Sequence, residues 1–326
     1  MRKAIAAVAV GWALLAACTA GGPAPDPAAS APTSLTVAAL KGPTGMGLAW
    51  MMSQPPTGAE PTETVFELSL HGSADEITPG LATGKLTLAC LPVNLAAVLR
   101  ARGVAIRLVA VNTLGVLHLV SKGLTVSTWA DLAGHTVLAT GKGATPEHVF
   151  DHLLERNGLS GQVRVEYFPE ASEVAARLAA ADSAIALLPE PYVTTVLSQD
   201  PELRLALDLS AEWDRVHPDS KLVTGALVAL DALVRDQPEA LAAFLAQYQA
   251  SIAFTNAHPA AAGVAIAELG IVPTAEVAAA AIPRSHLTFL SGAEAEQAVR
   301  GYLQVLYQAN PAAVGGELPD DDFYLP

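Results

Sequence analysis

The amino-acid sequence predicts an α/β protein with two lobes. Three observations predict this fold class. Short apolar runs alternate with amphipathic segments of helical length along most of the chain. The same pattern repeats in a second stretch, and a glycine-rich junction follows a predicted strand in each stretch. Because alternating strands and helices favour parallel sheets, whose ligands bind beyond the carboxyl ends of the strands, we expect mostly parallel sheets and a ligand cleft between the lobes.

The predicted elements follow one another in a regular order. The segment "NLAAVLRARG" is an expected helix that Gly103 stops, and "HVFDHLLERNG" is an amphipathic helix that ends in Asn-Gly. Beyond residue 230 the chain is expected to be almost wholly helical, from 237–259 to 293–310. Strands are predicted at 35–40, 64–70, the end of 79–91, 105–112, 114–120, 135–140, 163–168, 183–188, 203–209 and 221–230.

Composition excludes some classes of partner. The chain of 326 residues is 52% hydrophobic and carries a formal net charge of −14. It is long enough for two lobes with a large core, and so acidic a surface argues against a nucleic-acid partner and against broad adhesion to anionic lipid. Of the two cysteines, Cys90 lies in an apolar stretch and is expected to be a small core residue.

The N-terminus has the pattern of an export signal. Arg2 and Lys3 precede an apolar run that is shorter than the roughly 20 residues needed to cross a bilayer as a helix. The letters "LAAC" at its end resemble a bacterial lipobox, which implies a lipid on Cys18. We therefore expect a lipoprotein signal peptide over 1–17 and a flexible tether, rich in Pro, Ala, Gly and Ser, over 18–33. The competing interpretation is a core helix with a buried cysteine.

Two glycine-rich segments, "GPTGMG" (42–47) and "GKGATPE" (141–147), suit a ligand that accepts hydrogen bonds. Each follows a strand and begins a helix, whose first N–H groups are unpaired and whose dipole makes that end positive. Glycine allows close approach to the backbone, and Thr44 is able to cap the helix or to bond a ligand oxygen. Neither segment is a Walker or GxGxxG motif, so nucleoside triphosphates are disfavoured. Each segment alone is also compatible with a simple tight turn.

Several segments, in the same order, resemble a known family. "LKGPTGMGL" and "LPVNLAAVL" resemble two ligand loops of ABC-transporter substrate-binding proteins, and "AVNTLGVLHLV" and "LVTGALV" resemble their two crossovers. "DLAGHTVLATGKGATPEHVFDHLLERNGL" and "ALLPEPYVTTVL" resemble parts of the second lobe, and 282–326 is similar to the C-terminal end of one branch. From Ser34 onward the chain resembles the nitrate/sulfonate/taurine and pyrimidine-precursor superfamily. The resemblance implies the two-lobed type II periplasmic-binding-protein fold.

The resemblance also implies which residues face the ligand. For Tyr192, packing at a strand end is as good an interpretation as contact with the ligand. For Glu190, the alternative to contact with the ligand is bracing of its own loop. The charges in the implied loops are Lys41, Lys142 and Glu190, without an arginine, which favours a neutral or monoanionic organic molecule such as a sulfonate, a carboxylate or a nitrogen heterocycle. The implied ligand-binding residues are Gly42, Thr44, Gly45, Met46, Pro92, Asn94, Asn112, Thr113, Gly141, Gly143, Ala144, Thr145, Glu190 and Tyr192.

The function that the resemblance implies is solute capture outside the cytoplasm. Lobe one is expected over 34–120 and 221–326 and lobe two over 121–220, with hinges near 112–119 and 221–226. Closure of the lobes on the ligand would present the protein to an ABC permease coupled to an ATPase. We expect a monomer held to the membrane by its lipid, with no cofactor and no bound metal.

Two other functions compete with this one. An enzyme is disfavoured: His148 and His152 have the spacing of two zinc ligands, but the H-E-x-x-H glutamate and a third ligand are missing, so surface or packing roles are favoured. A lipid-anchored sensor that signals to a receptor would have the same two-lobed fold, and the sequence does not separate it from a transport protein.

Overall fold

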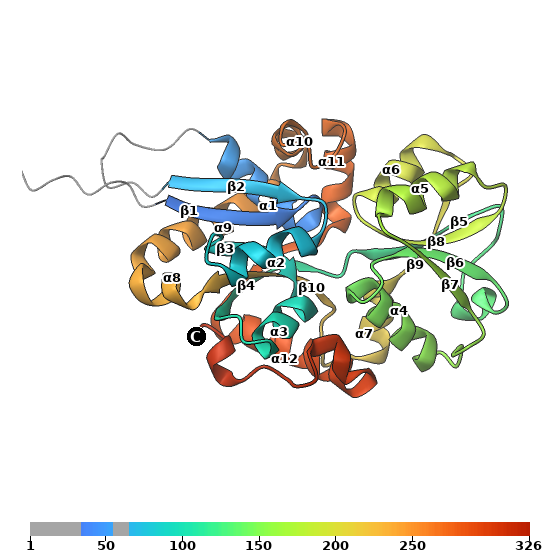
Figure 1. Cartoon of the computed structure of the whole chain (residues 1–326). Coiled ribbons are helices and arrows are strands. Elements are labelled where there is room, and N and C mark those ends of the chain that lie inside the picture. Colours follow the sequence, from blue (N-terminus) through green and yellow to red (C-terminus); the bar gives the residue numbers. More distant parts are fainter. Residues whose placement is uncertain (1–33, 55–64) are drawn as a thin grey trace, which may run out of the picture.

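The protein folds into two lobes that lie side by side, as the computed structural model shows for residues 34–54 and 65–326 (Figure 1). Cys18, the predicted signal peptide and the predicted tether lie outside the described residues. We call lobe one the six-stranded sheet with its helices, and lobe two the five-stranded sheet with its helices. The two-lobed α/β fold predicted from the sequence is confirmed.

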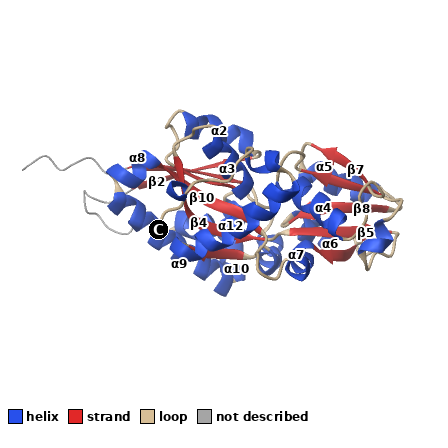
Figure 2. Ribbon diagram, turned by 90° about the horizontal axis from the view of Figure 1, so that it is seen from below, coloured by secondary structure: helices blue, strands red, loops and turns tan. Residues whose placement is uncertain are grey.

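Lobe one is built around a sheet with strand order β11-β4-β10-β3-β1-β2. Helices cover both faces of this sheet (Figure 2). The strands are β1 (Ser34–Leu40), β2 (Val65–His71), β3 (Leu88–Pro92), β4 (Ile106–Leu114), β10 (Val223–Leu230) and β11 (Leu287–Leu290). The helices are α1 (Pro43–Ser53), α2 (Ala74–Ala82), α3 (Val93–Ala101), α8 (Asp231–Asp236), α9 (Pro238–Ala257), α10 (Pro259–Glu268), α11 (Ala275–Ala281) and α12 (Gly292–Ala309), with short 3-10 turns at Ile282–Arg284, Pro311–Val314 and Asp321–Phe323.

Lobe two has the strand order β7-β6-β8-β5-β9. Apolar side chains of α4 and α7 pack on one face of its sheet, and those of α5 and α6 pack on the other. The strands are β5 (Leu117–Lys122), β6 (Thr136–Thr140), β7 (Arg164–Phe168), β8 (Ala184–Pro189) and β9 (Arg204–Asp208). The helices are α4 (Thr145–Arg156), α5 (Ala171–Ala180), α6 (Tyr192–Gln199) and α7 (Leu209–Val216), with a 3-10 turn at Trp129–Leu132.

The chain passes between the lobes twice, once from β4 to β5 and once from α7 to β10. Each crossing places a strand against the direction of its new neighbours: β5 is antiparallel to β8 and β9, and β10 is antiparallel to β3 and β4. The expectation of mostly parallel sheets is therefore wrong. Only the βαβ units, such as β1–β2 and β6–β7, keep parallel neighbours, because a crossover helix returns the chain to the same end of the sheet.

The C-terminal part of the chain departs from its predicted helical content. Strand β11 pairs antiparallel with β4 at the edge of the lobe-one sheet, although the tail was expected to be almost wholly helical. This strand is four residues long, "LTFL", and so carries too few residues for an alternating pattern to show. Helices α6 and α7, eight residues each, were also not anticipated.

The buried core is continuous across the crossing. One apolar cluster includes Leu108 and Tyr302 from lobe one and Phe150 and Trp213 from lobe two. The ring centroids of Trp213 and Tyr302 are 5.3 Å apart. A second cluster fills the other face of the lobe-one sheet, under α1, α9, α10 and α11. Among the helices of the described residues, none is both long enough and apolar enough to span a membrane.

Candidate functional site

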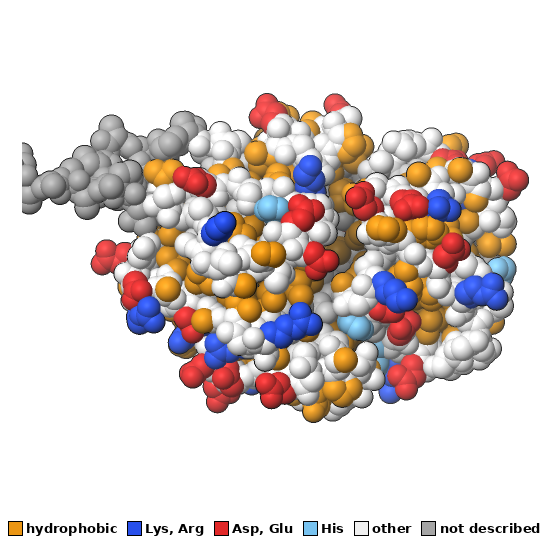
Figure 3. All heavy atoms as spheres, in the orientation of Figure 1, with side chains coloured by type: hydrophobic (Ala, Val, Ile, Leu, Met, Phe, Trp, Pro, Cys, Tyr) orange, Lys and Arg blue, Asp and Glu red, His pale blue; other side chains and the backbone are white. Residues whose placement is uncertain are grey.

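The predicted ligand loops meet at the junction of the two lobes, which is hollowed on the face seen in Figure 3. Helices α1, α3, α4 and α6 each begin directly after a strand, so their N-termini lie at the carboxyl ends of β1, β3, β6 and β8. Thr145 Oγ1 donates a hydrogen bond of 2.8 Å to Asn94 Oδ1. This bond joins the N-terminus of α3 in lobe one to that of α4 in lobe two, so the two ends face each other directly.

The N-terminus of α1 presents backbone and one hydroxyl. Gly42 is the N-cap residue and makes no side-chain cap, and Pro43 is the first helical residue, which has no N–H to leave unpaired. The Gly42 carbonyl accepts hydrogen bonds of 3.0 Å from the N–H groups of Gly45 and Met46. Thr44 Oγ1 is buried and has no hydrogen-bond partner among the described residues. A buried hydroxyl without a partner is costly, and a ligand oxygen or N–H would satisfy it.

Gly225 on β10 brings three of the predicted residues together. A Cβ atom added to Gly225 would lie 2.5 Å from Asn112 Oδ1, 2.8 Å from Thr44 Cγ2 and 2.9 Å from Thr113 Cβ. Only glycine fits there, so the side chains of Thr44 and Asn112 converge over the return strand. Gly225 is not among the predicted site residues, although a glycine inside an otherwise apolar strand indicates a close approach of another group.

Asn112 lies beside Thr44 but its amide group belongs to the interior of lobe one. It lies at the end of β4 and is 1% exposed. Its Oδ1 accepts a hydrogen bond of 3.0 Å from Thr113 Oγ1, and its side chain also lies within hydrogen-bonding reach of the buried Cys90 thiol and Tyr248 hydroxyl. Thr44 Oγ1 is therefore the unpaired group beside Gly225 that suits a polar ligand.

Asn94 and Thr145 are used within the protein. Pro92 is the N-cap residue of α3, and Asn94 Nδ2 donates to the carbonyl of Ala313 at 3.3 Å while its Oδ1 accepts from Thr145. Asn94 is 2% exposed and Thr145 is 4% exposed. Both residues thus brace the lobes against each other and leave little hydrogen-bonding capacity for a ligand.

The second glycine-rich segment forms a tight loop before α4. Gly141 and Gly143 have φ angles of +78° and +75°, which favour glycine, and Ala144 is the N-cap residue of α4. The Gly143 N–H donates to the Glu147 carboxylate, so this amide is already occupied. The loop is placed against lobe one, but its free groups are fewer than the sequence suggested.

Glu190 is held by an arginine that the sequence analysis did not associate with the site. Arg284 Nε donates to Glu190 Oε1 at 2.6 Å, and its guanidinium also donates to Thr194 Oγ1. The other oxygen of Glu190 accepts from the Thr194 N–H at 3.1 Å. Arg284 comes from the turn after α11, far from the predicted loops in sequence, and no local pattern indicated that it reaches lobe two. Glu190 is therefore a brace in this geometry, as one of its two interpretations expected.

A family model described as "NMT1/THI5 like" matches residues 67–262, more than half of the chain. The chain belongs to this family. No curated protein matches the chain.

Solved structures share the fold of this NMT1/THI5-like protein. An ABC transporter from Parabacteroides distasonis is 26% identical, with a TM-score of 0.76 over 90% of this chain and 99% of that one. The periplasmic aliphatic sulphonate binding protein SsuA from Escherichia coli is 18% identical, with a TM-score of 0.70 over 87% of this chain and 94% of that one. The periplasmic nitrate-binding protein NrtA from Synechocystis PCC 6803 is 12% identical, with a TM-score of 0.60 over 80% and 74%.

Two of the predicted site residues of this NMT1/THI5-like protein have no side-chain access to the cleft. Met46 is 0% exposed and packs in the lobe-one core, with its sulfur 3.8 Å from Ser285 Oγ. A Cβ on Gly45 would lie 2.6 Å from the Leu40 carbonyl oxygen, so Gly45 permits close packing of α1 on β1. The backbone N–H groups of both residues already donate to the Gly42 carbonyl, so neither Gly45 nor Met46 offers a free group to a ligand in this geometry.

Tyr192 and Cys90 both pack against apolar side chains of the core. Tyr192 is the first residue of α6 and is half-buried; burial, and then the nearby Glu170, raise the pKa of its hydroxyl. Cys90 is 0% exposed on β3, and burial raises the pKa of its thiol to about 12. A thiol that stays protonated at neutral pH is a core residue and not a nucleophile, as expected for Cys90.

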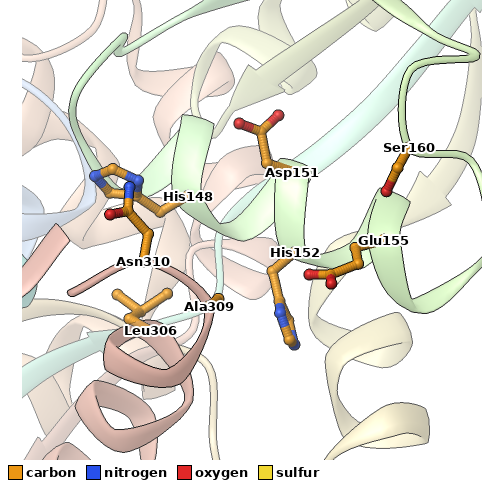
Figure 4. A pocket seen from close by; sticks show the side chains of 8 residues that line it. All are labelled: His148, Asp151, His152, Glu155, Ser160, Leu306, Ala309 and Asn310. Carbon is orange, nitrogen blue, oxygen red and sulfur yellow. The ribbon is translucent and has the colours of Figure 1, made fainter. Parts of the chain in front are cut away.

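The two histidines with zinc-like spacing point apart (Figure 4). They line a pocket of about 310 Å³ between α4 and the end of α12, where His148 lies beside Asn310. His152 instead forms a hydrogen bond with His217, with 2.7 Å between the two Nε2 atoms, and burial lowers the pKa of both imidazoles. Within 34–54 and 65–326 no three His, Cys, Asp or Glu side chains form a group able to hold a metal ion.

Proposed function

We propose that this protein is the solute-binding component of an ABC importer, acts outside the cytoplasm and captures a small organic molecule between its lobes. One observation carries the proposal. Thr44, near the N-terminus of α1, packs over Gly225 of the return strand, and its Oγ1 is buried without a partner among the described residues. A ligand held at this helix N-terminus would satisfy that hydroxyl.

The solved structures support this role by what their names state. SsuA binds aliphatic sulphonates and NrtA binds nitrate, and both are periplasmic. The Parabacteroides structure is named an ABC transporter. All three have the fold of this chain, which supports a two-lobed binding protein as its role.

The charges around the cleft favour a ligand that is neutral or carries one negative charge. Arg284 reaches Glu190 on one of the predicted ligand loops, but the Glu190 carboxylate, 2.6 Å away, neutralises its charge. Lys41 and Lys142 are exposed beside the two glycine-rich loops. The positive end of α1 contributes roughly half an elementary charge, which favours one carboxylate or sulfonate group. A dianion would usually be held by an arginine fork, and the nearby Arg284 is already paired with Glu190.

Capture would proceed by closure about two hinges, near 112–119 and 221–226. The sequence predicts lobe one over 34–120 and 221–326 and lobe two over 121–220, but β5 (Leu117–Lys122) pairs with β8 and β9, so the start of lobe two moves to Leu117. A ligand that touches both lobes binds the closed form better and shifts the population toward it. A lipid on Cys18 and a tether over 18–33 would keep a monomeric protein near its permease and ATPase, and raise its effective concentration there. We expect no enzymatic activity.

A thermal-shift panel tests the ligand class. The full chain carrying Cys18→Ser would be melted with monoanionic sulfonates and carboxylates, with neutral nitrogen heterocycles, and with dianions as the contrasting group. A ligand at 100 times its dissociation constant adds about 2.7 kcal/mol to the free energy of unfolding. We expect the stabilising compounds to lie among the neutral and monoanionic members. Stabilisation by dianions alone would contradict the charge argument.

A further inference from the structure

An ion pair joins the two lobes beside the proposed cleft. Arg284 belongs to lobe one, in the 3-10 turn Ile282–Arg284, and Glu190 belongs to lobe two, at the end of β8. The distance from Arg284 Nε to Glu190 Oε1 is 2.6 Å, and the same guanidinium donates to Thr194 Oγ1 on α6. One side chain of lobe one therefore engages two side chains of lobe two.

The burial of the pair is asymmetric. The Glu190 side chain is 0% exposed, whereas the Arg284 side chain is 37% exposed. A carboxylate without contact with water needs a cation or several donors, because the loss of its hydration is costly. Glu190 has two such partners, Arg284 and the Thr194 N–H, and only the second lies in its own lobe. Separation of the lobes would remove the cation and return the carboxylate to water.

The surroundings of the pair also belong to the junction. His286, two residues after Arg284, bonds to the Gly115 carbonyl in the first crossing. His118 on β5 is 1% exposed, and burial lowers the pKa of its imidazole. The pair thus stands next to the segment that must bend when the lobes open.

We propose that Arg284 is a positioning residue whose ion pair with Glu190 and bond to Thr194 form a latch that stabilises the closed lobes independently of any ligand. The latch regulates the site of the proposed function, because it sets the fraction of molecules that are closed before capture. The role of the latch in ligand capture rests on the proposed function. Its effect on lobe closure does not, because closure is measured without a ligand. Because Arg284 and Glu190 are paired with each other, neither side chain is free to pair with a charged ligand while the latch is closed.

Fluorescence transfer between the lobes tests the latch. Labels would be placed on Asp75→Cys in α2 and Ala176→Cys in α5, both exposed, in the full chain with Cys18→Ser; buried Cys90 would stay unlabelled. With no compound added, Arg284→Met should shift the transfer efficiency to lower values, as the lobes separate. Glu190→Gln should do the same, and Arg284→Lys should restore part of the efficiency, since lysine reaches one partner where arginine reaches two.

The double variant and a matched control decide the result. Arg284→Met with Glu190→Gln should give no larger shift than either change alone, because both remove one interaction. Lys122→Met removes a partly buried ion pair, with Asp200 at 2.8 Å, that lies wholly inside lobe two and adjoins neither label in the sequence, and should leave the efficiency unchanged. Glu190→Gln leaves no unpaired buried carboxylate, so it keeps the test valid if Arg284→Met fails to fold. Unchanged efficiency in Glu190→Gln, or additive shifts in the double variant, would overturn the latch.

Discussion

At the scale of single residues, removal of the unpaired Thr44 hydroxyl should affect ligand affinity and the free energy of unfolding differently. Because Thr44 Oγ1 bonds to nothing in the described protein, Thr44→Val should leave the free energy of unfolding unchanged or slightly higher. If the hydroxyl bonds a ligand, the same change should weaken binding by about 1 kcal/mol, or roughly fivefold. Calorimetric titration with a compound that stabilises the protein, together with denaturant unfolding, measures both quantities.

The chain offers a matched control for that change. Thr255 Oγ1 on α9 is also buried without a partner among the described residues, and Thr255 lies outside the predicted site. Thr255→Val should keep the wild-type affinity. Equal affinities of Thr44→Val and wild type would remove Thr44 from the site. A substitution of Gly45 would not be a clean test, because an added Cβ collides with the Leu40 carbonyl and disturbs folding.

Residues also show where sequence reasoning reached its limit. The glycine-rich ends at Gly42 and Gly141 were predictable, because local sequence determines tight loops before helices. Gly225 and Arg284 were not linked to the site, since their partners lie far away in the chain: Gly225 meets Asn112, and Arg284 meets Glu190. The glycine inside an apolar strand at Gly225 indicates a close approach but not its partner, and no local pattern indicates that Arg284 reaches lobe two.

At the scale of elements, the hydrogen bond between His152 on α4 and His217 after α7 ties two helices of lobe two together. Burial lowers the pKa of both imidazoles, so each contributes stability that is present above its ordinary pKa near 6.5 and is lost as the pH falls through the lowered value. We therefore expect the free energy of unfolding to fall as the pH drops below about 6.5.

His152→Gln tests this contribution. Glutamine keeps a polar side chain beside His217 but takes up no proton, so the acid-side slope of the free energy of unfolding should become shallower by up to one proton, about 1.4 kcal/mol per pH unit. Urea unfolding between pH 7 and about pH 5 gives the slope. The exposed His135→Gln is the matched control. An unchanged slope in His152→Gln would show that this imidazole is not the group that titrates.

The order of elements was largely predictable, and their pairing was less so. Strands such as β1 and β10 were found because their apolar runs are long and bounded by glycine or charge. The short β11 was missed, and the antiparallel placement of β5 and β10 was not anticipated, because the direction of a strand depends on which lobe the chain has just left. The pattern of apolar residues indicates which side chains are buried, but it does not indicate the direction in which a strand runs in its sheet.

At the scale of the whole molecule, capture between the lobes requires that the lobes move relative to each other. Two crossings connect them, and the side-chain contacts that join them include Asn94–Thr145 and Arg284–Glu190. Few polar contacts of this kind permit an equilibrium between open and closed forms that a ligand is able to shift. The rings of Trp213 and Tyr302 also pack against each other across the junction, with centroids 5.3 Å apart.

Capture by lobe closure is tested by the distance between the lobes as a ligand is added. The full chain with Cys18→Ser and labels at Asp75→Cys and Ala176→Cys would be titrated with the compound that gives the largest thermal shift. We expect transfer efficiency to rise with saturation of the site, and Thr44→Val to require a higher concentration for the same rise. A compound that binds tightly but leaves the efficiency unchanged would contradict capture between closing lobes.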